Sequence, residues 1–211
     1  RLSDECNRVS STFQKLVQDM DAAIRSGDAG AARAQLQGIV RQKIPRAFRM
    51  PLANLARRAG LADTSVRLLR PIVRPAARTV SAATPDETSE YAAALLKLGA
   101  VGEAEELLTS VNPARSPQAL LYLAFTKIAT WDYAVAIPHL RNYSKSDRVD
   151  EYQKQIGKLN LGAALVHERE VDEAISVLSS LRVELERAKN NRLLSNLLLC
   201  WAELEIECGS I

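Results

Sequence analysis

The stretch that decides the fold is LNLGAALVHEREVDEAISVL, which runs from Leu159 to Leu178. Its apolar residues recur every three or four positions on both sides of a polar centre. That spacing predicts two short amphipathic helices joined by a tight turn. One small residue stands on each helix, Gly162 on the first and Ala174 on the second. We therefore expect a helical hairpin whose two backbones cross closely at these positions.

The same pattern recurs upstream of this hairpin. Twelve positions separate Gly162 from Ala174, and the same interval separates Ala124 from Ala136, Ala92 from Ala104, Ala53 from Ser65 and Met20 from Ala32. A leucine follows each second member by four positions: Leu178, Leu140, Leu108, Leu69 and Leu36. In three hairpins a glycine precedes the second member by five: Gly27, Gly60 and Gly99. A recurrence of about 34 residues is typical of helical-hairpin solenoids.

These residues, with Ala-Ile at 174–175 and 136–137 and Ala-Glu at 104–105, give the chain a family likeness. It resembles the tetratricopeptide repeat (TPR) family from about Phe13 to Glu207. The match is good in the third to fifth hairpins and looser in the first two. The resemblance implies an all-α fold, a right-handed α-solenoid of about five antiparallel hairpins followed by a C-terminal helix. The alternative is an irregular helical bundle.

Composition agrees with a helical chain that forms one domain over residues 1–211. Hydrophobic residues make up 47% of the sequence but aromatic residues only 5%, so the apolar material is mostly Ala and Leu, and almost no strand is expected. Residues 1–80 hold fifteen Lys and Arg against six acids, which leaves about +9 there and about −6 in the rest. We expect a basic half, a partly irregular connector at about 71–84, and an acidic half from 85 onward.

Residues typical of turns and helix caps indicate where each helix begins and ends. The expected helices span Phe13–Ile24, Ala31–Val40, Pro51–Gly60, Asp63–Arg70, Pro85–Leu98, Glu103–Val111, Gln118–Ala129, Asp132–Leu140, Asp147–Glu168, Val171–Ala188 and Arg192–Glu207. Pro71 should end the fourth helix early, and Pro138 should cause a kink or a late start, because proline lacks an amide hydrogen. The Thr84-Pro85-Asp86-Glu87 run predicts a capping box.

Catalysis has almost no support in the sequence. No phosphate-binding loop, HExxH, GxSxG or paired acidic motif is present, and His139 and His167 each stand alone. Three dispersed cysteines form neither a disulfide framework nor a zinc site and suggest a reducing compartment. We therefore expect no enzyme, no cofactor and no metal, and a cytoplasmic location.

The ends of the chain and its hydropathy add two further expectations. No apolar run approaches the roughly 18 residues of a membrane span, and no signal peptide is recognisable. Membranes are therefore not expected partners. Because the sequence begins at Arg1 rather than Met, we expect the chain to be a piece of a longer protein.

The family resemblance implies protein recognition on the surface lined by the first helix of each hairpin. Carried over by spacing, the binding groove includes Asn54, Arg57, Arg58, Lys97, Tyr122, Phe125, Ile128, Asn160 and His167. A clamp for a terminal carboxylate, used by some members, is not reproduced, since Val17, Asp21 and Pro51 stand at its positions. The expected function is a scaffold or adaptor that binds a peptide or helix of a partner protein.

The segment from Arg41 to Arg78 holds ten basic residues against one acid, Asp63. It is either a solvated helix face or a docking surface for an acidic protein partner. Nucleic acid or anionic lipid is the remaining alternative, and single-stranded nucleic acid is a weak fit because only Phe48 is nearby to stack on a base. The alternative function is therefore the regulatory or sensor domain of a nucleic-acid-associated protein such as a transcriptional regulator.

The last helix has too wide an apolar stripe for a terminal capping helix. The stripe includes Leu194, Leu197, Leu198, Trp201 and Leu204. We expect this helix to pack against another copy of the chain, against a partner, or against a continuation of the protein.

Overall fold

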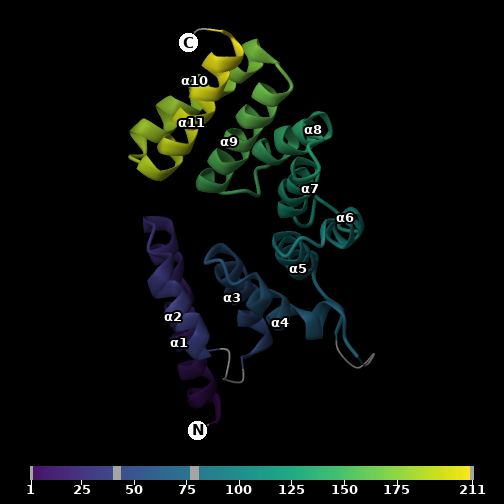
Figure 1. The fold of residues 1–211 in the computed structure, drawn as a ribbon. Coiled ribbons are helices and arrows are strands. Elements are labelled where there is room, and N and C mark those ends of the chain that lie inside the picture. The colour runs from purple at the N-terminus through teal and green to yellow at the C-terminus, as the bar shows by residue number, and fades with distance from the viewer. Residues whose placement is uncertain (1, 40–43, 77–80, 210–211) are drawn as a thin grey trace. The chain divides into compact units, whose positions relative to one another are not determined.

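The computed structural model describes residues 2–39, 44–76 and 81–209, which contain eleven helices and no strand (Figure 1). The helices are α1 (Leu2–Ser26), α2 (Ala29–Ile39), α3 (Arg46–Arg58), α4 (Ala62–Val73), α5 (Pro85–Lys97), α6 (Val101–Thr109), α7 (Gln118–Ala129), α8 (Tyr133–Ser144), α9 (Glu151–His167), α10 (Val171–Arg187) and α11 (Asn191–Glu207). The predicted all-α class is confirmed.

The chain divides into two compact units, Arg1–Leu107 and Leu108–Ile211. In the first unit the odd-numbered helices pack in order, α1 on α3 and α3 on α5. Helix α2 packs on α1 and α3, and α4 packs on α3 and α5. In the second unit α8 packs on both α7 and α9, α9 packs on α10, and α11 packs on both α9 and α10. Within each unit, therefore, successive hairpins stack side by side.

The repeat positions identified in the sequence form the centre of this packing. The second-helix members Ala32, Ser65, Ala104, Ala136 and Ala174 are all fully buried, as are the leucines four residues after them, at 1% exposure or less. In the anchor hairpin, a Cβ added to Gly162 would lie 2.5 Å from Cδ2 of Leu178. The close crossing of α9 and α10 predicted from Gly162 and Ala174 is confirmed. Ser65 is the one polar residue among these second-helix positions, and its buried hydroxyl has no hydrogen-bond partner within the described residues.

At six places, a helix is joined to the one that follows it by the same type of turn. A residue with positive φ follows the helix in each case: Gly27, Gly60, Gly99, Trp131, Arg169 and Lys189. The amide of the next residue donates to the carbonyl five positions back, for example Leu61 to Ala56 at 2.7 Å and Asp132 to Lys127 at 2.9 Å. This is the Schellman helix end, in which glycine is preferred because the left-handed backbone costs it nothing. The predicted turn role of the three glycines is confirmed.

Prolines interrupt the helices less than expected. Helix α3 begins at Arg46 and includes Pro51, so the expected start near Pro51 is wrong. Helix α4 continues through Pro71 to Val73, so the expected early end is wrong as well. Helix α8 begins at Tyr133 with Pro138 inside it. The missing amide costs each helix one hydrogen bond, and neighbouring buried residues such as Leu52 and Ile72 offset that loss.

Two further helices begin a turn or more from the expected residue, and one of them is α9, which begins at Glu151 rather than Asp147. Helix α1 begins at Leu2, well before Phe13. Val40, the expected end of the second helix, lies outside the described residues, as does part of the expected connector. The capping box at the start of α5 is confirmed, with Glu87 N–H donating to Thr84 Oγ1 and Thr84 N–H donating to Glu87 Oε2.

Candidate functional site

The first helices of the first unit are joined by buried charges. Arg57 on α3 donates to both carboxylate oxygens of Glu90 on α5, from Nε at 2.6 Å and from Nη2 at 3.2 Å. Asn54, one turn earlier on α3, donates to the same carboxylate at 2.8 Å. The side chains of Arg57 and Glu90 are only 11% and 4% exposed. The low local dielectric strengthens such a bidentate pair, and it also makes loss of either partner costly.

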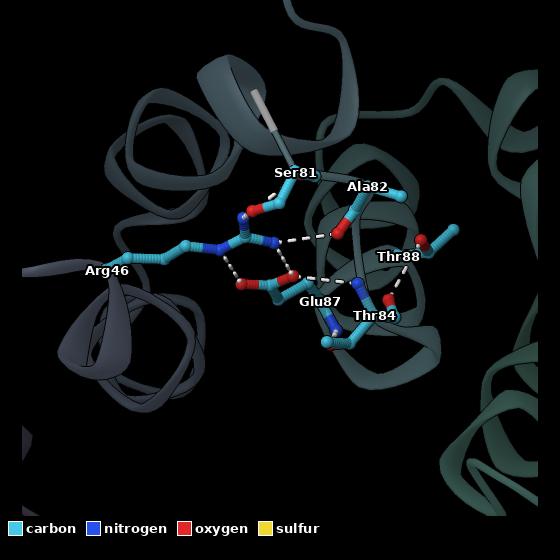
Figure 2. Close-up of polar contacts among 6 residues, drawn as sticks. All are labelled: Arg46, Ser81, Ala82, Thr84, Glu87 and Thr88. Atoms are coloured by element: carbon cyan, nitrogen blue, oxygen red, sulfur yellow. Dashed lines mark hydrogen bonds and ion pairs between the residues drawn. The ribbon is translucent and has the colours of Figure 1, made fainter. Parts of the chain in front are cut away.

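A second ion pair joins the same two helices nearer the start of α5. Arg46 donates to Glu87 from Nε at 3.2 Å and from Nη2 at 2.9 Å (Figure 2). Its guanidinium also donates to the carbonyl oxygens of Ser81 and Ala82, at 3.0 and 2.8 Å. One arginine therefore ties α3 to α5 and to the segment before α5. We call Arg46, Asn54, Arg57, Glu87 and Glu90 the polar frame.

The Glu87 carboxylate has a lowered pKa. Burial acts to raise the pKa, but the hydrogen bonds and charge of Arg46, together with the bonds from Thr84, outweigh it. Asp21 on α1 behaves in the same way, because burial is outweighed by Arg58, at 2.5 Å, and by Arg25, so its pKa is lowered. Both carboxylates are therefore held in their charged form at neutral pH.

The lowered pKa of Glu87 predicts acid-sensitive stability. A carboxylate whose folded pKa lies below its unfolded value, 4.5 for Glu87, stabilises the fold above that value and loses this contribution as pH falls through the folded pKa. Glu87→Gln should therefore lower the urea midpoint at pH 7 and shrink the difference between midpoints at pH 7 and pH 3. Glu106→Gln, at an exposed position of α6, is the matched control. A Glu87→Gln protein with the wild-type pH dependence would contradict the prediction.

An open surface cavity of about 430 Å³ lies beside the polar frame. Ala47, Met50 and Pro51 of α3 form its apolar side, and Thr84, Asp86 and Glu87 of the α5 start form its polar side together with Arg46. The lining therefore combines apolar side chains with the charged groups of Arg46 and Glu87, which are held by hydrogen bonds.

The structure brings some of the predicted groove residues together and separates others. Asn54 and Arg57 meet at Glu90, whereas Arg58 turns toward Asp21 on α1. Lys97 is exposed at the end of α5. The predicted groove therefore contains paired as well as exposed charges in the first unit.

The predicted residues of the second unit also differ in exposure. Tyr122 is buried beside the half-buried Phe125, with ring centroids 6.4 Å apart, and Ile128 is half-buried. Asn160 donates to the Ile156 carbonyl of its own helix at 2.8 Å. His167 is exposed and stacks on Tyr133. The groove assignment of these residues stays a prediction.

The predicted C-terminal interface is partly internal. Leu197 and Leu204 are buried within the second unit, and Leu194 and Trp201 are half-buried. The Trp201 indole N–H donates to Glu205 at 2.9 Å. Leu198 is 49% exposed, and two further residues, Leu199 and Ile206, are each 63% exposed. An apolar face of α11 is open in the described chain, and its role as an interface stays a prediction.

The sequence analysis does not identify Glu87 and Glu90 as the carboxylates that pair with the arginines of the polar frame. The sequence predicts Glu87 as a cap but not as a partner of Arg46, and it does not single out Glu90. A signal is present, since Arg57 follows the crossing residue Ala53 by four and Glu90 precedes the crossing residue Ala92 by two. Placing those positions opposite each other requires the offset between neighbouring hairpins, which the sequence does not contain.

Most of the basic side chains described between Arg41 and Arg78 form hydrogen bonds or ion pairs within the chain. Seven of its ten basic residues lie in the described ranges, and six of them contact acceptors of the chain: Arg46, Arg49, Arg57, Arg58, Arg67 and Arg74. Arginines held by carboxylates are less available to phosphate groups. The nucleic-acid alternative is therefore not favoured.

Metal binding and membrane crossing find no support in residues 2–39, 44–76 and 81–209. No cluster of three or more His, Cys, Asp or Glu side chains there could hold a metal ion. Within the same ranges, no helix combines the length and the apolar character needed to cross a membrane.

The stacked hairpins define a class of fold, the TPR-like helical repeat. No family model matches the sequence, and no curated protein matches it significantly. Among solved structures, the chain is similar to a variant of a Podospora anserina protein with nearly identical TPR-like repeats. The two share 21% identity and a TM-score of 0.54, over 85% of this chain and 97% of that one.

A second solved structure supports the same fold. The chain is similar to a tetratricopeptide repeat protein from Parabacteroides merdae, with 14% identity and a TM-score of 0.51, over 94% of this chain and 77% of that one. At these identities the likeness shows the fold alone. The predicted TPR-like solenoid of helical hairpins is confirmed.

Proposed function

We propose that the chain is a non-catalytic scaffold that binds an extended segment or a helix of a partner protein along the first helices of its hairpins. Solenoids of this class offer extended surfaces for such binding. The observation that carries the proposal is the cavity of about 430 Å³ beside the polar frame. It offers an apolar anchor point next to fixed charges, the combination that gives a docking site both affinity and orientation.

The polar frame changes how charge should contribute. Arg46 and Arg57 already face Glu87 and Glu90, so a partner carboxylate would have to compete with them. Residues 1–107 still hold sixteen Lys and Arg against twelve Asp and Glu. An acidic partner is thus favoured by the net charge of the unit, which steers encounter, while the cavity selects an apolar side chain.

The test fills the cavity without touching the ion pairs. Ala47 is exposed and lines the cavity, so Ala47→Tyr should block an incoming side chain and reduce partner recovery in quantitative affinity capture from native lysate by about tenfold. Ala34→Tyr, at an exposed position of α2 away from the cavity, is the control. If both variants recover the same proteins as the wild type in the same amounts, the cavity is not the docking site.

Reversing the charge of Arg57 would be a poor test of binding. Arg57→Glu would place a second carboxylate against the buried Glu90, and like charges in a buried site are strongly unfavourable. Lost binding would then report a damaged fold.

A further inference from the structure

Three aromatic side chains gather at the turn edge of the second unit. Trp131 follows α7, Tyr133 begins α8, and His167 ends α9. The rings of Tyr133 and His167 stack with centroids 4.3 Å apart, and Trp131 meets Tyr133 edge-on at 6.2 Å. Trp131 is 77% exposed. We call these three residues the aromatic edge.

Trp131 occupies a position where a bulky residue is costly. Its φ is +61°, at the turn position that Gly27, Gly60 and Gly99 occupy in the first unit. A left-handed backbone costs an L-residue roughly 1–2 kcal/mol. Because the indole is mostly exposed, burial does not offset that cost. Arg169 and Lys189 adopt the same backbone conformation, with φ of +60° and +53°, so the feature particular to Trp131 is its exposed indole.

The two turns that carry the aromatic edge are acidic. Residues 130–133 and 167–173 contain five acids against one base, a formal charge of −4 with His167 neutral: Asp132, Glu168, Glu170, Asp172 and Glu173 against Arg169. Arg169 is paired with Glu207 at 3.3 Å, and Glu173 is paired with Arg141. Lys127 lies one turn before Trp131 on α7. The balance of charge around the exposed indole remains negative.

We propose that the aromatic edge binds a basic segment of a protein partner, with an arginine or lysine side chain lying on the indole of Trp131. A cation is attracted to the face of an aromatic ring, and tryptophan is the best of the aromatic residues for this contact. The carboxylates of Asp132 and Glu168 attract the remaining basic residues of the segment. The aromatic edge shares no residue with the lining of the cavity beside Met50, and the proposal holds whether or not that cavity binds a partner.

The decisive variant is Trp131→Gly. Glycine adopts the left-handed turn without cost, so the variant should be at least as stable as the wild type in urea unfolding. Lys189→Gly is the matched control, because Lys189 also has a positive φ, +53°, at an equivalent turn but lacks an aromatic ring. Any loss of binding shown by Trp131→Gly alone is then due to the indole.

The probe is a fluorescein-labelled peptide of alternating glycine and arginine, compared by anisotropy with the same peptide carrying neutral citrulline and with a glycine–glutamate peptide. The arginine peptide should bind wild type and Lys189→Gly equally, and Trp131→Gly about tenfold more weakly. In a Trp201→Phe background, it should also change the fluorescence of the remaining indole. Equal binding of the arginine and citrulline peptides, binding of the glutamate peptide, no binding at all, or unchanged affinity in Trp131→Gly would each overturn the proposal.

Discussion

Replacing Glu90 with alanine is expected to lower the free energy of unfolding by about 3–5 kcal/mol. The Glu90 carboxylate is 4% exposed and accepts hydrogen bonds from Arg57 and Asn54, so its removal takes away the group that balances a nearly buried guanidinium. Urea unfolding followed by far-ultraviolet circular dichroism measures the loss.

Two comparisons show whether the stability lost in Glu90→Ala comes from the burial of the ion pair or from the pairing of charges alone. Arg74 and Glu103 form an ion pair of similar length, 2.7 Å, but their side chains are 51% and 39% exposed, so Glu103→Ala should cost less than about 1 kcal/mol. The double variant Arg57→Met, Glu90→Leu replaces a buried pair by apolar side chains and should recover most of the stability lost in Glu90→Ala. Equal losses in Glu90→Ala and Glu103→Ala would show that burial of the Arg57 pair is not what sets its energy.

The polar frame therefore serves stability and the candidate site together. It fixes α5 against α3, and the cavity is formed by residues of these two helices. A partner that inserts a side chain beside Met50 would meet a surface whose charged groups are already held by hydrogen bonds. Such preorganisation lowers the entropy lost on binding.

Local sequence signals are enough to establish the hairpins and their crossing points. Small residues twelve positions apart, with a leucine four positions later, predict that Ala32, Ala104, Ala136 and Ala174 are buried, and all four are. These positions are decided by close packing within one hairpin, which depends on neighbours in the sequence. Proline penalties are overestimated at Pro51 and Pro71, because tertiary burial can offset one missing hydrogen bond.

The candidate site is harder to predict because it depends on contacts between hairpins. The basic character of Arg57 is visible in the sequence, but its neutralisation by Glu90 depends on how α3 and α5 are offset. The exposed Trp131 carries a usable signal, since it precedes Ala136 by five, the interval at which glycine precedes the crossing residue in the first three hairpins. Arg169 also replaces glycine at this interval, before Ala174, but only at Trp131 is the replacement aromatic, and that residue marks the aromatic edge.

A single methyl group at the crossing of α9 and α10 should destabilise the second unit. In Gly162→Ala, the new Cβ would lie 2.5 Å from Cδ2 and 2.9 Å from Cγ of Leu178. Rotating the end of the leucine could move Cδ2 but not Cγ, and Leu178 is fully buried. Overpacking of this kind costs typically 1–3 kcal/mol, and the better helix propensity of alanine returns at most about 1 kcal/mol. We expect a net loss of about 1–2 kcal/mol in urea unfolding.

Two further variants test whether the crossing causes this loss. Gly102→Ala adds the same methyl group to α6, where nothing lies within 4 Å of the new Cβ, and should raise stability by up to about 1 kcal/mol. Leu178→Ala alone should cost about 2–5 kcal/mol, but it empties the space that the new methyl needs. In that background Gly162→Ala should be neutral or stabilising, because the two positions are coupled through one contact. If Gly162→Ala were stabilising in the wild-type background, as Gly102→Ala should be, α9 and α10 would not cross as closely as their small residues require.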